Sequence, residues 1–143
     1  MAARPATVRL SDAVVGAIVE QYTDPGSHDP RALLLITTRP ALRDAFLGTA
    51  AGIEDPLTAV IAERIGDSGQ LTAQVLAASV AAAVRIALGQ WVRPATALPP
   101  ASGLVVPSGS LPDLLRTALA PLVPALDAAE ERLPRFRHRG GEC

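Results

Sequence analysis

Few side chains in this sequence could act as metal ligands, bases or nucleophiles. His28 lies between Asp24 and Asp29, and the other histidine, His138, lies near the end of the chain. A histidine flanked by carboxylates could bind a metal ion. The stretch around His28 is rich in proline and glycine, however, and aspartates in such turns more often cap helices. We therefore expect no metal site.

The sequence also lacks the residue groupings that usually carry out catalysis. The single cysteine, Cys143, is the last residue, so it has no disulfide partner within the chain. Neither a Ser-His-Asp nor a Cys-His arrangement is evident, and no glycine-rich loop follows a strand to hold a phosphate. We expect no catalytic residue, no cofactor and no enzymatic activity.

Four residues are instead predicted to contact a small ligand: Tyr22, Phe46, Arg85 and Trp91. The aromatic residues offer apolar area, and two of them add a polar group. Each has a simpler alternative, with Phe46 in the core, Trp91 at a helix end and Tyr22 on the surface. Arg85 is the most informative, because a buried guanidinium without a partner is costly. It reaches a carboxylate across a dimer, extends to solvent or binds an anionic ligand.

The composition indicates that helices position these residues. Hydrophobic residues make up 49% of the chain and aromatic residues only 3%, so Ala, Leu and Val must fill the interior. No long stretch alternates apolar with polar residues, which argues against a sheet. The sequence therefore predicts an all-α helical bundle.

Proline, glycine and capping residues predict where the helices begin and end. We expect one domain over residues 10–133, with a flexible stretch over 1–9, a loop over 94–110 and a disordered tail over 134–143. The expected helices are one capped by Ser11 and stopped by residues 24–27, one starting at Asp29 and Pro30, one starting at Pro40, one from Asp55 and Pro56 to Gly66, one over 71–92, and a last one that starts at Ser110 or Pro112 and is bent by Pro121 and Pro124.

The long helix predicts a dimer, because one of its faces is lined mostly by small residues. Residues on that face recur at alternating spacings of four and three, which lets a second helix approach closely. Another face carries larger side chains that suit the core. We expect a two-fold dimer through the last two long helices, formed by Val75, Ala78, Ala82 and Gly89 of one and Leu115, Leu119 and Leu122 of the other. The alternative is that the small-residue face packs on another helix of the same chain.

Several segments resemble the C-terminal domain of TetR-family transcriptional regulators. The stretch 38–46, Thr-Arg-Pro-Ala-Leu-Arg-Asp-Ala-Phe, is similar to the Arg-Pro-x-Leu-Arg-x-x-Phe segment that opens the sixth helix in many actinobacterial members. Residues 62–66 resemble the end of the following helix, 71–91 the eighth helix and 111–115 the start of the ninth. The resemblance covers residues 10–128.

This resemblance implies a sensory domain of a bacterial repressor. In that family the C-terminal domain dimerises through its last two helices and encloses a small-molecule pocket, and the bound effector shifts two N-terminal DNA-reading heads. The helix-turn-helix of the family precedes the region matched here, where this chain has only a short stretch. We expect no DNA binding by the chain as it stands, whether it is a truncated form, a mis-started reading frame or a natural headless relative.

Charge and hydropathy narrow the partners further. The net charge of −1 gives no general attraction to phosphate backbones, and no uncharged run is long enough for a membrane span. We therefore expect a cytoplasmic homodimer that binds a small, mainly apolar effector. The alternative is a standalone helical interaction protein that heterodimerises with a full-length regulator and modulates it.

Overall fold

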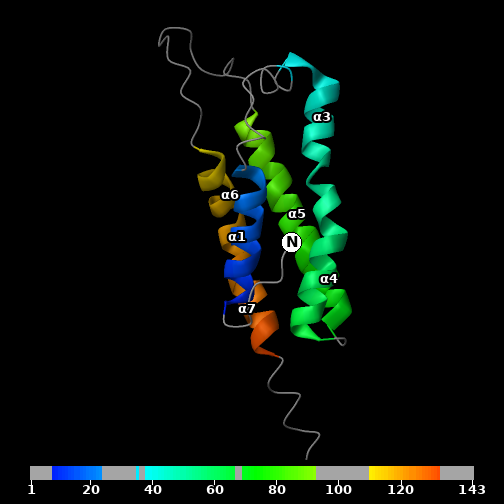
Figure 1. Cartoon of the computed structure of the whole chain (residues 1–143), viewed down its shortest axis with the longest axis vertical. Coiled ribbons are helices and arrows are strands. Elements are labelled where there is room, and N and C mark those ends of the chain that lie inside the picture. The colour runs from blue at the N-terminus through cyan, green and yellow to red at the C-terminus, as the bar shows by residue number, and fades with distance from the viewer. Residues whose placement is uncertain (1–7, 24–34, 36–37, 67–68, 93–109, 133–143) are drawn as a thin grey trace, which may run out of the picture.

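The computed structural model describes residues 8–23, 35, 38–66, 69–92 and 110–132, and every regular element in these ranges is helical (Figure 1). The prediction of an all-α fold is confirmed. The elements are α1 (Leu10–Thr23), α3 (Pro40–Gly48), the 3-10 helix η2 (Ala51–Ile53), α4 (Glu54–Ile65), α5 (Gln70–Trp91), α6 (Leu111–Leu119), the 3-10 helix η6 (Ala120–Leu122) and α7 (Val123–Glu131).

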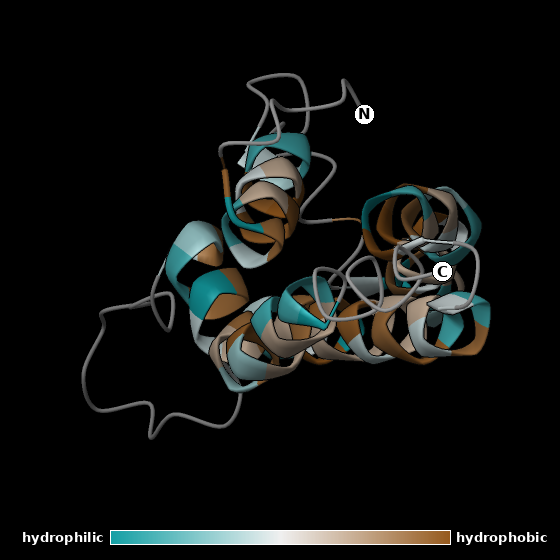
Figure 2. Ribbon diagram, turned by 90° about the horizontal axis from the view of Figure 1, so that it is seen from below, coloured by the Kyte–Doolittle hydropathy of each residue, from teal (hydrophilic) through white to brown (hydrophobic). Residues whose placement is uncertain are grey.

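Helix α5 is the central element of an elongated bundle. It packs against α4 on one side and α6 on the other, and α1 packs against α6 and α7. Figure 1 shows α3 and α4 as one nearly continuous column, joined through η2, and Figure 2 shows the same bundle along its long axis.

Alanines on the inner face of α5 allow the neighbouring helices to approach closely. Ala73, Ala77 and Ala87 are almost fully buried there, beside Val80 and Val84. Larger side chains from the other helices fill the space around them, as expected of an interior with few aromatic residues. The main contributors are Leu10, Ile18, Leu57, Ile61, Leu115, Leu119 and Leu126.

Three of the predicted helix boundaries are confirmed. The Ser110 hydroxyl caps α6 by accepting a hydrogen bond from the Asp113 amide at 3.3 Å. Helix α4 ends at Ile65, and Gly66 follows it as the cap residue, with a φ of 89° that glycine adopts easily. Around Pro121 and Pro124 the last helix is interrupted by η6, because proline lacks the amide hydrogen that the α-helical ladder needs.

Two predicted caps are wrong. Ser11 is not a cap but is buried within the first turn of α1, which begins at Leu10. Asp55 is not a cap either, since α4 begins at Glu54 and continues directly from η2. The start of α1 is held by a hydrogen bond from the Leu10 amide to Glu130, which is distant in the sequence. The start of α4 follows directly from η2.

Two stretches are long and apolar enough to cross a membrane by length and composition alone: Pro40–Ile65 and Gln70–Trp91. The core helix of a globular domain passes the same test. In α5, 44% of the apolar window is buried inside the bundle. The column Pro40–Ile65 is interrupted by η2.

Other predictions fall outside the described residues. They are the helix start at Asp29 and Pro30, the loop over 94–110, most of the stretch 1–9 and the tail over 134–143, together with His28, Asp24, His138 and Cys143. Among the described residues, no group of three His, Cys, Asp or Glu side chains could hold a metal ion.

Candidate functional site

The structure brings together three of the four predicted ligand residues. Phe46 of α3 and Trp91 of α5 are half-buried, and their ring centroids lie 6.2 Å apart with an interplanar angle of 42°. Such a tilted pair is a favourable aromatic geometry. Tyr22, near the end of α1, is buried, and its hydroxyl oxygen lies 3.3 Å from Oγ1 of Thr49.

Thr49 connects the tyrosine to the aromatic pair. Its hydroxyl donates a hydrogen bond of 2.7 Å to the Phe46 carbonyl oxygen, so its own proton is already used. In the contact with Tyr22, Thr49 Oγ1 is therefore the acceptor and the phenol is the donor. We call Tyr22, Phe46, Thr49 and Trp91 the aromatic cluster. Thr49 was missed from the sequence, although a hydroxyl three residues after Phe46 is placed on the same side of a helix.

The Tyr22 phenol is the buried polar group of the cluster. The phenol oxygen of Tyr22 donates to Thr49 and still has lone pairs to accept a further hydrogen bond. The remaining contact area comes from the rings of Phe46 and Trp91, which pack against the hydrophobic core.

The fourth predicted ligand residue, Arg85, lies elsewhere. It is exposed on the side of α5 that faces away from the core. Of the three alternatives predicted for Arg85, the one seen in this single chain is extension to solvent. Arg85 is therefore not a member of the aromatic cluster.

The outward side of α5 carries large apolar side chains in a line. Leu71 is 74% exposed, Val75 57% and Ile86 55%, and the alanines Ala78 and Ala82 between them are exposed too. The spacing of these residues places them on one helix face, opposite the buried Val80 and Val84. We call Leu71, Val75, Ala78, Ala82 and Ile86 the α5 stripe.

The structure separates the predicted interface residues into two groups. Val75, Ala78 and Ala82 belong to the α5 stripe. Gly89 is half-buried, because Leu47 of α3 in the same chain lies over it; a Cβ added to Gly89 would be 3.9 Å from Leu47 Cδ2.

The predicted interface residues of the last helix have a different place. Leu115 and Leu119 are fully buried in the core of their own chain, and Leu122 is half-buried against it. Leu115 and Leu119 lie on α6, which packs on both α5 and α1. An apolar residue on α6 suits a core as well as an interface, so the pattern alone could not tell the two apart. Leu115 and Leu119 are core residues, and we leave them out of the surface proposed below.

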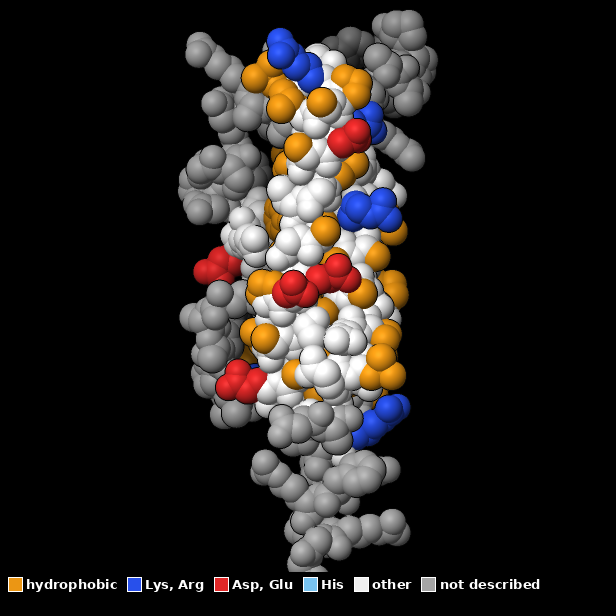
Figure 3. Space-filling model, turned by 90° about the vertical axis from the view of Figure 1, so that its right-hand side faces the viewer, with side chains coloured by type: hydrophobic (Ala, Val, Ile, Leu, Met, Phe, Trp, Pro, Cys, Tyr) orange, Lys and Arg blue, Asp and Glu red, His pale blue; other side chains and the backbone are white. Residues whose placement is uncertain are grey.

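Helix α3 is the one α-helix among the described residues that has no buried residue. Its Leu42 is 41% exposed. Figure 3 looks onto the α3 and α4 column and shows apolar side chains gathered over the end where α3 lies. Since Phe46 is on α3, one side of the aromatic cluster is supplied by a loosely held helix.

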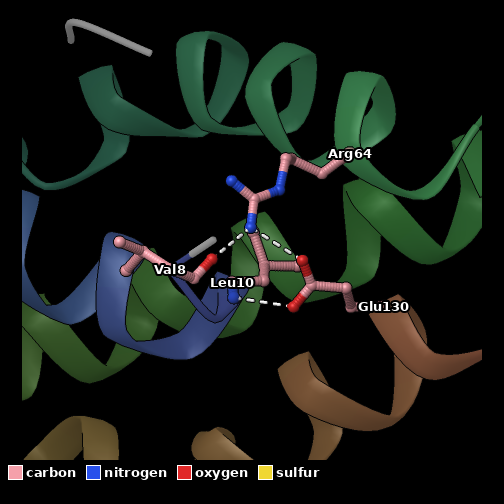
Figure 4. Close-up of polar contacts among 4 residues, drawn as sticks. All are labelled: Val8, Leu10, Arg64 and Glu130. Carbon is pink, nitrogen blue, oxygen red and sulfur yellow. Dashed lines mark hydrogen bonds and ion pairs between the residues drawn. The ribbon is translucent and has the colours of Figure 1, made fainter. Parts of the chain in front are cut away.

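A polar junction at the far end of the bundle was also missed from the sequence (Figure 4). Nη2 of Arg64, on α4, donates to the Val8 carbonyl oxygen at 2.6 Å and to Oε1 of Glu130, on α7, at 2.7 Å. Oε2 of Glu130 accepts a hydrogen bond of 2.8 Å from the Leu10 amide at the start of α1. Each of these hydrogen bonds joins residues more than fifty positions apart, so no local pattern predicts them.

A family model described as the MftR C-terminal domain matches residues 5–127, which is most of the chain. No curated protein and no solved structure matches the chain.

Proposed function

Since the chain belongs to the TetR-type family of MftR C-terminal domains, we propose that it is the effector-binding and dimerisation domain of a transcriptional regulator and pairs through the α5 stripe. The observation that carries the proposal is the exposure of Leu71, Val75 and Ile86 along one face of a long helix. Apolar side chains in a contiguous row on a surface commonly mark an interface.

The small residues of the α5 stripe support pairing with a second copy. Ala78 and Ala82 lie at its middle, where short side chains let two helix backbones come close. In a two-fold dimer the same face is used by both copies, so the stripe must complement itself. A row with small residues at its centre and larger ones at its ends meets that requirement when two copies of α5 cross near Ala78 and Ala82.

Size-exclusion chromatography with light scattering tests the dimer. The native chain is expected to elute as a dimer, and Ala82→Arg as a monomer, because a large charged side chain would be forced into the centre of the contact. Ala59→Arg, at an exposed alanine of α4, is the matched control and should remain dimeric. A monomeric native chain, or equal behaviour of the two variants, contradicts the proposal.

For the effector, we propose a small, mainly apolar molecule that contacts the aromatic cluster. Phe46 and Trp91 supply apolar contact area, and Tyr22 supplies one acceptor for a hydrogen bond. Arg85 is retained in this proposal only as a residue beside the α5 stripe, where it is available to an anionic group or to a carboxylate of the second copy.

Trp91 allows direct observation of binding, since it is the only tryptophan in the chain. Medium-chain fatty alcohols and simple phenols are suitable probes, because each combines an apolar body with one hydroxyl group. A binding probe is expected to change Trp91 fluorescence and to raise the melting temperature as its concentration increases. Phe46→Ala should weaken both effects, and Leu42→Ala, at an exposed position of the same helix, should not. Equal responses of the two variants would place the binding site elsewhere.

We further propose a cytoplasmic location, no enzymatic activity and no DNA binding by residues 10–132 themselves. The whole chain has a net charge of −1, and five of its thirteen arginines lie outside residues 10–132, which supports the last point because DNA-binding surfaces are normally basic. The alternative, a helical protein that heterodimerises with a full-length regulator, uses the same α5 stripe. Mixing the chain with such a regulator and measuring the mass of the product separates the two proposals.

A further inference from the structure

We propose that Arg64 and Glu130 form a latch that holds the first turn of α1, and the chain leading into it, against α4 and α7. One arginine and one carboxylate make three hydrogen bonds of 2.6 to 2.8 Å to each other and to the backbone at Val8 and Leu10 (Figure 4). The inference does not depend on the proposed dimer or effector, because all the groups belong to one chain.

The latch replaces the cap that the start of α1 lacks. The first amides of a helix have no partner within the helix, so they need an acceptor from elsewhere. Ser11, the residue expected to provide one, is buried inside the first turn. Glu130 provides it instead, through Oε2 to the Leu10 amide. A negative charge is also favourable here, because the amino end of a helix carries a partial positive charge.

Arg64 fixes the position of that carboxylate. It pairs with Oε1 of Glu130 at 2.7 Å and leaves Oε2 for the Leu10 amide. The same nitrogen holds the Val8 carbonyl oxygen at 2.6 Å, so the backbone on both sides of Arg9 is bound. Both side chains are partly buried, with 18% of Arg64 and 29% of Glu130 exposed, which limits screening by water.

The surrounding packing shows which helices the hydrogen bonds of Arg64 and Glu130 join. Helix α4 packs mainly on α5, and α7 mainly on α1. Arg64 and Glu130 thus join α4 to α7 at one end of the bundle. The neighbouring pair, Arg9 and Asp127, is weaker, since its atoms are 3.7 Å apart and the Arg9 side chain is 74% exposed. Opening the latch would therefore free the first turn of α1 while the apolar core stays packed.

Amide hydrogen exchange in the full chain, followed residue by residue by NMR, tests the latch. Arg64→Gln and Glu130→Gln are each expected to speed exchange of the Leu10 amide by about tenfold or more, since a charge-assisted hydrogen bond is lost. The amides of Val80 and Val84, in the core of α5, should keep their native rates. Arg116→Gln, which removes an exposed pair with Asp113, is the matched control and should leave the Leu10 amide unchanged.

Two outcomes would overturn the latch. One is an unchanged Leu10 rate in both variants, and the other is an equal acceleration at Leu10 and at Val80, which would mean that the whole bundle has loosened. The exchanged pair Arg64→Glu with Glu130→Arg adds a test of the cap. It restores opposite charges but places a cation at the start of α1, so the fast exchange should persist. Recovery of the native rate would contradict the role of Glu130 as a cap.

Discussion

At the scale of single residues, burial decides which of two roles an apolar side chain has. Leu115 and Leu71 are both leucines on helices with an apolar face, but Leu115 is fully buried and Leu71 is 74% exposed. Leu115 should therefore contribute to the free energy of unfolding of each chain, and Leu71 only to the association of two chains.

Leu115→Ala is expected to lower the free energy of unfolding by about 2 to 5 kcal/mol, because it leaves a cavity in a packed core. Leu71→Ala should change it by less than about 0.5 kcal/mol at a protein concentration low enough to keep the chain monomeric. Urea unfolding at that concentration measures both. Equal losses would place both leucines in the same environment and contradict the distinction.

The backbone at Gly66 leads to a second residue-scale prediction. Its φ of 89° and ψ of 165° suit glycine, so Gly66→Ala should destabilise the chain by about 1 to 3 kcal/mol. Gly48 is the matched control, since it ends helix α3 and a Cβ there would meet nothing within 4 Å. Gly48→Ala should be neutral or stabilising by up to about 1 kcal/mol. Thermal unfolding followed by circular dichroism compares the two, and similar losses in both would contradict the assignment to backbone conformation.

At the scale of the elements, α3 and α5 have opposite degrees of burial. Helix α3 has no buried residue, and α5 has a buried inner face along its whole length. Amides in α3 should therefore exchange with solvent about a hundredfold faster than those near Val80 and Val84 of α5, because local opening of α3 exposes little apolar area. Hydrogen exchange with mass spectrometry checks this, and equal protection would mean that α3 is held by contacts beyond those described.

The helices show how much of the fold could be predicted from the sequence. Pro121 and Pro124 act within their own turn, and so does the cap at Ser110, so these features were visible locally. The start of α1 depends on Glu130, which is 120 positions away from Leu10, and no local pattern contains that information.

The candidate site was predictable to a similar extent. Residue type was enough to propose Tyr22, Phe46 and Trp91 as neighbours of a ligand, because aromatic side chains are few in this sequence. It was not enough to place Arg85, whose exposure depends on which face of α5 the other helices cover. Periodicity gives the relative angle between two faces of a helix, but not which one lies inside.

At the scale of the whole molecule, the α5 stripe predicts an association driven by apolar contact. Raising the NaCl concentration from about 0.1 M to about 1 M should leave the dimer intact, since salt screens charges but does not weaken apolar burial. Sedimentation velocity at the two concentrations checks this. Dissociation at high salt would mean that ion pairs involving Arg85 hold the copies together.

The separation of the buried core from the α5 stripe has a consequence for a cell that makes more than one version of this protein. In the proposed dimer each copy keeps Leu115 and Leu119 inside its own core, so we expect a copy to stay folded when it leaves its partner. Subunits would then exchange, and hybrids would form in proportion to the abundance of each version. A version with a damaged aromatic cluster but an intact stripe would enter hybrids with normal copies, and its defect would be dominant over theirs.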